Sequence, residues 1–508
     1  MDQLSKALAT LSKEQVLGIR RGLEKESLRA LPGGGVALTP HPAGLGSALT
    51  HTRITTDFSE SQLELITGVH ASVKDCLAEL TDIQRFTTSK LGDEMLWVSS
   101  MPCGLPADDA IPIGQYGTSN VGQAKSVYRT GLGHRYGRRM QTISGIHYNW
   151  SFPGLSSEAY FGLIRNFRRN AFLLLYLFGA SPAVCSSFVA GRQHALQRLS
   201  EHTMYLPYAT SLRMGRLGYQ SDAQSTLAVS YNSLEGYAHS LEGALTSPYP
   251  AYEAIGVRAE DGQYRQLGTS LLQIENEFYG TMRPKRVIFP GERPLHALRE
   301  RGVEYVEVRL MDLDPFEPMG ISEQTMCFLD VFLTYCHLAD SPNDTLEEIA
   351  ALGHNQHVVA ERGREPGLTL TRGTEQVLLT DWGRELLNAL GPIAAKMDSA
   401  LGGSQYAQAV DAALRMLDQP EDLPSARVLR EVQEHFDGSF VGFVRAQSVR
   451  TKQAMLDTPL GAERLAHFEG LSAQSVKDQA HIEANDSMPF DIYLQEYLSP
   501  RRLVAKAA

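Results

Sequence analysis

The sequence places acidic side chains inside segments that otherwise have the pattern of buried strands. Glu24 and Glu26 stand at i and i+2 in residues 18–29, among the apolar Ile19, Leu23 and Leu28. Side chains of a strand alternate, so the two carboxylates project to the same face about 7 Å apart. Carboxylates that converge in a partly buried site repel each other unless they are protonated or a positive charge lies between them. Any fold of this chain must therefore bring a proton or a cation to this strand, unless the strand is a solvated edge.

Three more acidic residues extend the pattern. Asp57 and Glu64 are expected to flank a turn that enters a short helix, where Asp57 could serve only as an N-cap. Glu307 lies in a strong strand pattern over residues 303–313. Hard divalent cations such as Mg²⁺ or Mn²⁺ take oxygen ligands, and sites of this kind usually handle phosphate. The acidic residues therefore favour a nucleotide-using enzyme.

Other polar residues offer partners for such a site. Residues 143–152 alternate like a strand whose polar face carries His147 and Asn149, and His147 is either a metal ligand or an ordinary core or surface histidine. Glu307 and Arg309 share a strand face, where they form either a structural ion pair or a metal ligand beside a phosphoryl-binding arginine.

A basic cluster follows the strand expected at residues 269–279. Arg283, Lys285 and Arg286 form either a phosphate site or a solvated turn. The chain has no P-loop, no G-x-G-x-x-G run and no G-x-S-x-G elbow. The sequence therefore gives no evidence for a P-loop or dinucleotide-binding fold, or for a serine hydrolase.

Composition excludes several classes of protein. The 508 residues carry a net charge of −11, which argues against a general nucleic-acid binder. The most apolar run, residues 171–179, is far shorter than the ~20 residues that cross a bilayer. The five cysteines are dispersed without C-x-x-C spacing, so they indicate neither a disulfide framework nor a zinc site. We expect a cytoplasmic protein without membrane or nucleic-acid partners.

The periodicity predicts an α+β protein. Strands are expected at 18–29, 143–152, 269–279 and 303–313, and helices at 72–91, 156–178 and 230–246, with an almost wholly helical pattern from about 376 onward. We expect an α+β catalytic region over residues 1–370 and a helical region over 371–508 packed on it, without a flexible linker.

Many stretches resemble the proteobacterial type of glutamate–cysteine ligase, a family distantly related to glutamine synthetase. The similarity runs from about residue 16 to residue 498, and the stretches that carry it are GIRRGLEKESLR (18–29), LGSALTHTRITTDFSESQLELIT (45–67), GDEMLWVSSMPC (92–103), QYGTSNVGQAKSVYRTGL (115–132), RYGRRMQTISGIHYNWSFP (135–153), YLFGASPAVCSSF (176–188), YLPYATSLRMGRLGY (205–219), LLQIENEFYGTMRPKR (271–286) and VEYVEVRLMDLDPF (303–316). The resemblance implies a glutamine synthetase-like body with a mainly antiparallel curved sheet flanked by helices.

The resemblance also implies roles for individual residues. Glu26, Asp57 and Glu64 match one metal site, and Glu24, His147 and Glu307 match another. Arg309 matches an arginine near the transferred phosphate, and Arg213 matches one that holds glutamate. The cysteine acceptor pocket is matched by Phe58, Tyr128, Leu132, Gln141 and Tyr219. Arg129, Arg283, Lys285 and Arg286 are further expected contacts of phosphate or substrate.

The implied activity is ATP-dependent ligation of L-glutamate to L-cysteine through γ-glutamyl phosphate, the first step of glutathione biosynthesis. ATP and Mg²⁺, or Mn²⁺, are the implied cofactors, and a monomer is the implied state. Two alternatives stay open: a γ-glutamyl ligase that uses another small amino acid, and a catalytically silent binding homologue. A pocket discriminates one methylene by only ~1–3 kcal/mol, so the sequence defines the reaction better than the acceptor.

Overall fold

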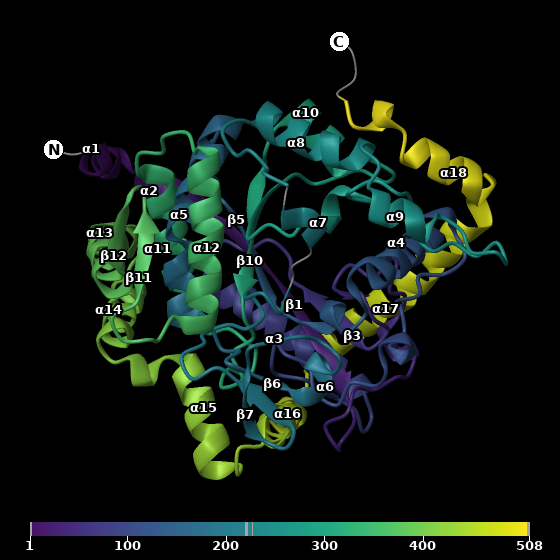
Figure 1. Cartoon of the computed structure of the whole chain (residues 1–508), viewed down its shortest axis with the longest axis horizontal. Helices are drawn as coiled ribbons and strands as arrows, with labels where there is room; N and C mark the ends of the chain where they lie inside the picture. Colours follow the sequence, from purple (N-terminus) through teal and green to yellow (C-terminus); the bar gives the residue numbers. More distant parts are fainter. Residues whose placement is uncertain (1–2, 219–221, 226, 505–508) are drawn as a thin grey trace.

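A central antiparallel sheet organises the computed structural model, which describes residues 3–218, 222–225 and 227–504 (Figure 1). Six strands follow the order β2-β3-β1-β5-β10-β9, and β4 pairs with β1 beside this path. Their bounds are β1 Arg20–Ala30, β2 Ile54–Thr56, β3 Gln62–Ile66, β4 Met95–Leu96, β5 Ile146–Ser151, β9 Met282–Lys285 and β10 Tyr305–Met311. Two smaller sheets are β6 Ala183–Cys185, β8 Thr203–Tyr205 and β7 Gln197–Ser200, and the hairpin β11 Thr369–Arg372 with β12 Glu375–Leu378.

Helices cover one face of the sheet in two layers. The helices are α1 Gln3–Thr10, α2 Lys13–Gly18, α3 Val73–Lys90, α4 Asn120–Tyr136, α5 Ser157–Phe178, α6 Ser186–Val189, α7 Asp222–Ser225, α8 Leu234–Thr246, α9 Pro250–Ile255, α10 Pro294–Arg301, α11 Glu323–Leu338, α12 Leu346–Arg362, α13 Leu379–Leu401, α14 Gln405–Asp418, α15 Pro424–His435, α16 Phe440–Asp457, α17 Ala462–Asn485 and α18 Phe490–Tyr497. Helices α3 and α5 pack on the strands, α11 packs on both, and α12, α13 and α14 form the outer layer. Serine side chains cap the N-termini of α3, α4 and α5, as expected for these starts.

The helical C-terminal part shares the core of the body. Helices α13 and α14 pack on α11, while α16 and α17 return to α3 and α18 reaches α4. One cluster of buried apolar residues runs from Leu11 to Leu503. The boundary proposed at residue 370 falls inside β11, and it stays a prediction.

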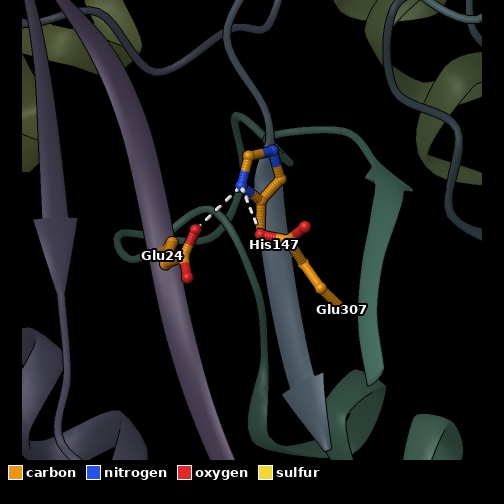
Figure 2. Close-up of side chains that lie close together, drawn as sticks. All are labelled: Glu24, His147 and Glu307. Carbon is orange, nitrogen blue, oxygen red and sulfur yellow. Dashed lines mark hydrogen bonds and ion pairs between the residues drawn. The ribbon is translucent and has the colours of Figure 1, made fainter. Parts of the chain in front are cut away.

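Cross-strand register puts the apolar and the acidic residues on opposite faces of the sheet. Glu24 pairs with His147 across β1 and β5 (Figure 2), and Glu26 pairs with Glu64 across β1 and β3. Directly opposed residues share a face, so these four side chains lie together. Leu23, which precedes Glu24, is fully buried on the helix-covered face and is the cross-strand partner of Tyr148. The predicted alternation of β5 is confirmed, as are the strand over 303–313 and the helices that became α3, α5 and α8.

Three local predictions are wrong. Asp57 and Glu64 do not flank a helix start, because β2 and β3 form a hairpin in which Asp57 N donates to Gln62 O at 3.0 Å. Residues 269–279 are not a strand, since Glu275 and Glu277 sit in a 3₁₀ turn. Buried ion pairs with Arg293 and Arg135, at 2.6 and 2.8 Å, explain the alternating acids there. The basic residues from 283 to 285 belong to β9 itself and do not follow a strand.

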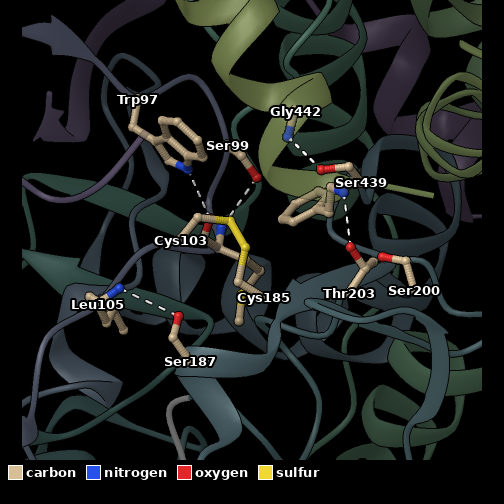
Figure 3. The surroundings of a disulfide bond; sticks show 12 residues. Trp97, Ser99, Cys103, Leu105, Cys185, Ser187, Ser200, Thr203, Ser439 and Gly442 are labelled. Atoms are coloured by element: carbon tan, nitrogen blue, oxygen red, sulfur yellow. Dashed lines mark hydrogen bonds between the residues drawn. A yellow bond between two sulfur atoms is a disulfide. The ribbon is translucent and has the colours of Figure 1, made fainter. Parts of the chain in front are cut away.

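Cys103 and Cys185 form a disulfide, although the dispersed spacing of the cysteines indicated no disulfide framework (Figure 3). Their Cα atoms lie 5.2 Å apart although 82 residues separate them in the sequence. Spacing along the chain says nothing about cysteines that the fold brings together, which is why the pair escaped prediction. Cys76, Cys327 and Cys336 are free and buried.

Candidate active site

His147 lies among carboxylates on the sheet face opposite α3 and α5, and Figure 2 shows it between Glu24 and Glu307. Its Nδ1 is 3.1 Å from Glu24 Oε2 and 3.9 Å from Glu307 Oε1. Its Nε2 is 3.5 Å from Glu26 Oε1. Three adjacent strands, β1, β5 and β10, supply these four residues, so the sheet itself sets the spacing.

The donor atoms fall into two groups that suit divalent cations. One consists of Glu24, His147 and Glu307, the other of Glu26, Glu64 and His147, and within each group the ligand atoms lie within 4.8 Å of one another. Carboxylate oxygens with one imidazole match the preferences of Mg²⁺ and Mn²⁺. Oε2 of Glu307 is buried and accepts no hydrogen bond, although Arg309 Nη1 lies 3.3 Å away. The residues therefore fit a metal ion, and His147 belongs to both groups.

Burial and mutual repulsion perturb the acids unequally. Burial raises the pKa of Glu64 well above its usual value, and the charges of Glu24, Asp57 and Glu26 add to this. Burial also raises the pKa of Glu26, which His147 partly offsets. Two of the acids therefore favour a proton while no cation is bound.

The acids nearer β10 behave in the opposite way. Burial alone would raise the pKa of Glu307, but Lys285, Arg309 and His147 hold it well below its usual range. Burial and Glu307 likewise oppose ionisation of Glu24, yet the hydrogen bond and charge of His147 lower its pKa overall. These two carboxylates are thus kept charged by neighbouring cations.

Asp57 stands at the rim of the cluster. It is half-buried after β2, and its charge raises the pKa of both Glu26 and Glu64. It belongs to neither group of donor atoms that lie within 4.8 Å of one another. Its role as a ligand stays a prediction.

The basic residues divide by position. Lys285 Nζ is 3.3 Å from Glu307 Oε1, and Arg309 Nη1 is 3.4 Å from His147 Nδ1. Arg283 is the cross-strand partner of Glu307. Arg286 makes its contacts elsewhere, with Glu304 at 3.4 Å and with the carbonyl group of residue 301.

Arg213 lies beside the cluster at the wall of a pocket of about 610 Å³. Its Nη2 donates to Arg309 O at 2.8 Å, and Nη1 is 3.8 Å from Asp312 Oδ1. A Cβ at Gly145 would collide with this guanidinium, and Gly145 N also donates to Glu26 Oε2 at 2.7 Å. The close approach of the three groups therefore requires glycine here.

The residues expected at the acceptor pocket gather around α4. Tyr128 and Leu132 stand one turn apart on this helix, and Phe58 packs near its Gly133. Gln141 follows in a 3₁₀ turn and donates to the hydroxyl of Tyr279 at 2.7 Å. Tyr219 lies outside the described residues.

Sequence reasoning missed residues that position the site. Asp312 is buried and accepts hydrogen bonds from Ala180 N, Ser181 Oγ and Ser211 Oγ at 2.8, 2.7 and 3.0 Å, which fixes it beside Arg213. Asn149 Nδ2 donates to Glu24 Oε1 at 2.9 Å. An acid directly after a buried strand was the available signal for Asp312, whereas its serine partners come from distant segments.

Comparison with known proteins agrees with this arrangement of fold and site. The family model described as glutamate-cysteine ligase matches residues 5–359. A curated glutamate–cysteine ligase of Alcanivorax borkumensis is 46% identical, with 97% of each chain covered, and that of Saccharophagus degradans is 47% identical, with 94% of each covered. The crystal structure of glutamate–cysteine ligase from Francisella tularensis in complex with AMP has a TM-score of 0.90 at 38% identity, covering 95% of this chain and 97% of that one.

The antiparallel sheet with its helical C-terminal part is the fold of a ligase-type enzyme, and the acidic face has the donor atoms that suit divalent cations. The chain belongs to the glutamate–cysteine ligase family. Within the described residues, no helix is both long and apolar enough to cross a membrane.

Proposed function

We propose that this protein joins the γ-carboxylate of L-glutamate to the amine of L-cysteine with cleavage of ATP to ADP and phosphate, the first step of glutathione biosynthesis. The observation that carries the proposal is the convergence of five metal-ligand candidates beside Arg309 on one sheet face. The curated relatives named glutamate–cysteine ligase, matched over nearly their whole length, support it.

The chemistry explains why so many charges gather here. Glutamate's γ-carboxylate attacks the terminal phosphorus of ATP, which gives γ-glutamyl phosphate and ADP. The amine of cysteine then displaces phosphate, loses a proton and forms the γ-peptide bond. Bringing a carboxylate to a triphosphate costs about 4 kcal/mol at 4 Å in an effective dielectric near 20.

The acidic face would reduce this cost by holding Mg²⁺, or Mn²⁺. Glu24, Glu307 and His147 would hold one ion, and Glu26, Glu64 and His147 another, with Asp57 at the rim. Bound ions of this kind neutralise phosphate charge and orient the reacting oxygens. The raised pKa values of Glu26 and Glu64 are consistent with sites that are completed by a cation.

Two arginines complete the donor side. Arg309 would stabilise charge on the transferred phosphoryl group, because it stands between Glu307 and His147. Arg213 would hold glutamate from the wall of the adjoining pocket, oriented by Asp312. Arg283 and Lys285 flank Glu307 and are proposed phosphate contacts.

The acceptor would lie against α4, where Phe58, Tyr128, Leu132 and Gln141 gather. We further propose that the protein acts in the cytoplasm as a monomer on small-molecule substrates. Size-exclusion chromatography with light scattering tests the monomer, since a dimer mass would contradict it.

ADP release with glutamate and a panel of amino acids, with product masses read directly, tests the function. We expect release to depend on both substrates and the mass to be that of γ-glutamylcysteine. A higher kcat/KM for 2-aminobutyrate than for cysteine would overturn the assignment of cysteine as the acceptor substrate. Nucleotide binding without turnover, with Mg²⁺ and all substrates present, would overturn the reaction.

A further inference from the structure

Two cations of α4 lie over the same aromatic ring at the edge of the acidic cluster. Lys125 Nζ is 5.2 Å from the centroid of Tyr116, and the guanidinium carbon of Arg129 is 4.5 Å from it. The residues stand at i and i+4, where like charges on a helix repel each other. The pair therefore needs a compensating contact.

Within the described residues, the hydrogen bonds of the pair go to neutral groups. Arg129 donates through Nε to Asp57 O and through Nη1 to Lys125 O, which are neutral carbonyl groups. Neither side chain forms an ion pair with any residue that the structure describes, and Lys125 Nζ makes no hydrogen bond to those residues. Burial and the charge of Arg129 lower the pKa of Lys125 to about 8, although the negative charge of Glu64 acts to raise it. An ammonium in this setting is costly without an anion.

The position of the pair connects both halves of the site. The Tyr116 hydroxyl group donates to Thr56 O and Asp57 O, each at 2.6 Å, which fixes the ring beneath the hairpin that bears Asp57. Along α4, Lys125 and Arg129 precede Leu132 by seven and three residues, so the three share a helix face. The cations thus lie between the acidic cluster and the expected acceptor pocket.

We propose that Lys125, together with Arg129, binds an oxyanion of a substrate, either the carboxylate of the acceptor or a phosphate oxygen of ATP. This inference rests on the proposed function and assigns a residue that the sequence motifs did not single out. The acidic cluster and this pair are complementary: carboxylates converge where a cation must enter, and cations converge where an anion must enter.

A structural role makes a different prediction. If Lys125 served only to stack on Tyr116, Lys125→Met would lower the melting temperature and leave substrate constants alone. If it binds an oxyanion, removing a part-buried charge that forms no ion pair with the described residues leaves the melting temperature unchanged or higher, while substrate binding weakens.

Steady-state kinetics of the full-length protein separates these roles. Lys125→Met is compared with Lys125→Arg, which keeps the cation, and with Lys74→Met, which removes an exposed lysine from α3. KM is measured for glutamate, ATP and cysteine, and kcat/KM is measured for cysteine and for cysteamine, which lacks the carboxylate. Lys125→Gln replaces Lys125→Met should the latter fail to fold.

We expect roughly a 10- to 100-fold rise in one KM for Lys125→Met, in the range of one lost charge-assisted hydrogen bond. A rise for cysteine with loss of the preference over cysteamine identifies the acceptor carboxylate. A rise for ATP with that preference retained identifies the phosphate. In either case Lys125→Arg recovers most of the effect and Lys74→Met shows none.

Unchanged constants for all three substrates would overturn the inference, as would a rise confined to glutamate. Failure of the proposed function is distinguishable, because wild-type protein would then release no ADP in response to cysteine. A wild-type protein that ligates normally beside an unaffected Lys125→Met variant rejects only the oxyanion role.

Discussion

The two faces of the central sheet use buried charge in different ways. On the helix-covered face, Arg21 Nη2 pairs with Asp330 Oδ2 at 3.0 Å, and Tyr148 and Tyr406 donate to the same carboxylate at 2.8 and 3.3 Å. On the opposite face, which carries the acidic cluster, Glu26 and Glu64 meet as cross-strand partners and repel each other. The first arrangement is satisfied within the protein and stabilises it, whereas the second becomes satisfied only when ligands bind.

This comparison predicts that the charges on the helix-covered face contribute most to the stability of the fold. Asp330→Ala leaves Arg21 buried without its partner, and we expect a loss of about 3–5 kcal/mol in the free energy of unfolding, measured by urea denaturation. Asp340→Ala, at an exposed position just beyond α11, is the matched control. A loss below about 1 kcal/mol for Asp330→Ala would show that the buried pair contributes little.

Substitutions on the face with the acidic cluster should affect turnover most. Glu307→Gln keeps the shape of the side chain but removes a charge from one donor group, so we expect kcat to fall about 100-fold or more, equal to roughly 2.7 kcal/mol. The fold should persist by circular dichroism. Glu304→Gln, just before β10 and paired with Arg286, is the control. Near-normal activity of Glu307→Gln across a range of Mg²⁺ concentrations would contradict the metal assignment.

Arg213 gives a smaller and more selective test. Arg213→Ala should raise the KM for glutamate by about 10-fold or more, since one charge-assisted contact is lost, with less change in the KM for ATP. The exposed Arg216→Ala serves as control. An unchanged dependence on glutamate would remove Arg213 from the substrate site.

The smallest expected effect concerns pH. Because burial and neighbouring acids raise the pKa of Glu64, the metal-free folded protein holds a proton that the unfolded chain releases above pH 4.5. Stability is then lost as the pH rises toward the folded pKa. Glu64→Gln removes this loss, so its stability relative to wild type should increase from pH 5 to pH 8 by about 1 kcal/mol in EDTA.

Added Mg²⁺ should reverse that difference, because the ion stabilises only the wild-type cluster. Thermal melts at the two pH values, with EDTA and with Mg²⁺, measure both effects. A Glu64→Gln variant that is less stable than wild type in EDTA at pH 8 would contradict the repulsion inferred between Glu64 and the neighbouring acids of the cluster.

The sequence predicted the regular parts of both faces. Alternation along β5 placed His147 and Tyr148 on opposite faces of the strand, and the i, i+2 spacing placed Glu24 and Glu26 on the same face. It could not show which strands pair, so the meeting of Glu64 with Glu26 came only from the resemblance and then from the register. The 3₁₀ turn at Glu275 escaped prediction because distant arginines satisfy its acids. Likewise, Asp312 and the Cys103–Cys185 disulfide depend on contacts between segments far apart in the chain.

Anomalous diffraction from crystals grown with Mn²⁺ and a non-hydrolysable ATP analogue tests the central claim most directly. We predict manganese peaks within coordination distance of His147, one shared with Glu24 and Glu307 and one with Glu26 and Glu64. Bound nucleotide with no manganese at either position would contradict the account.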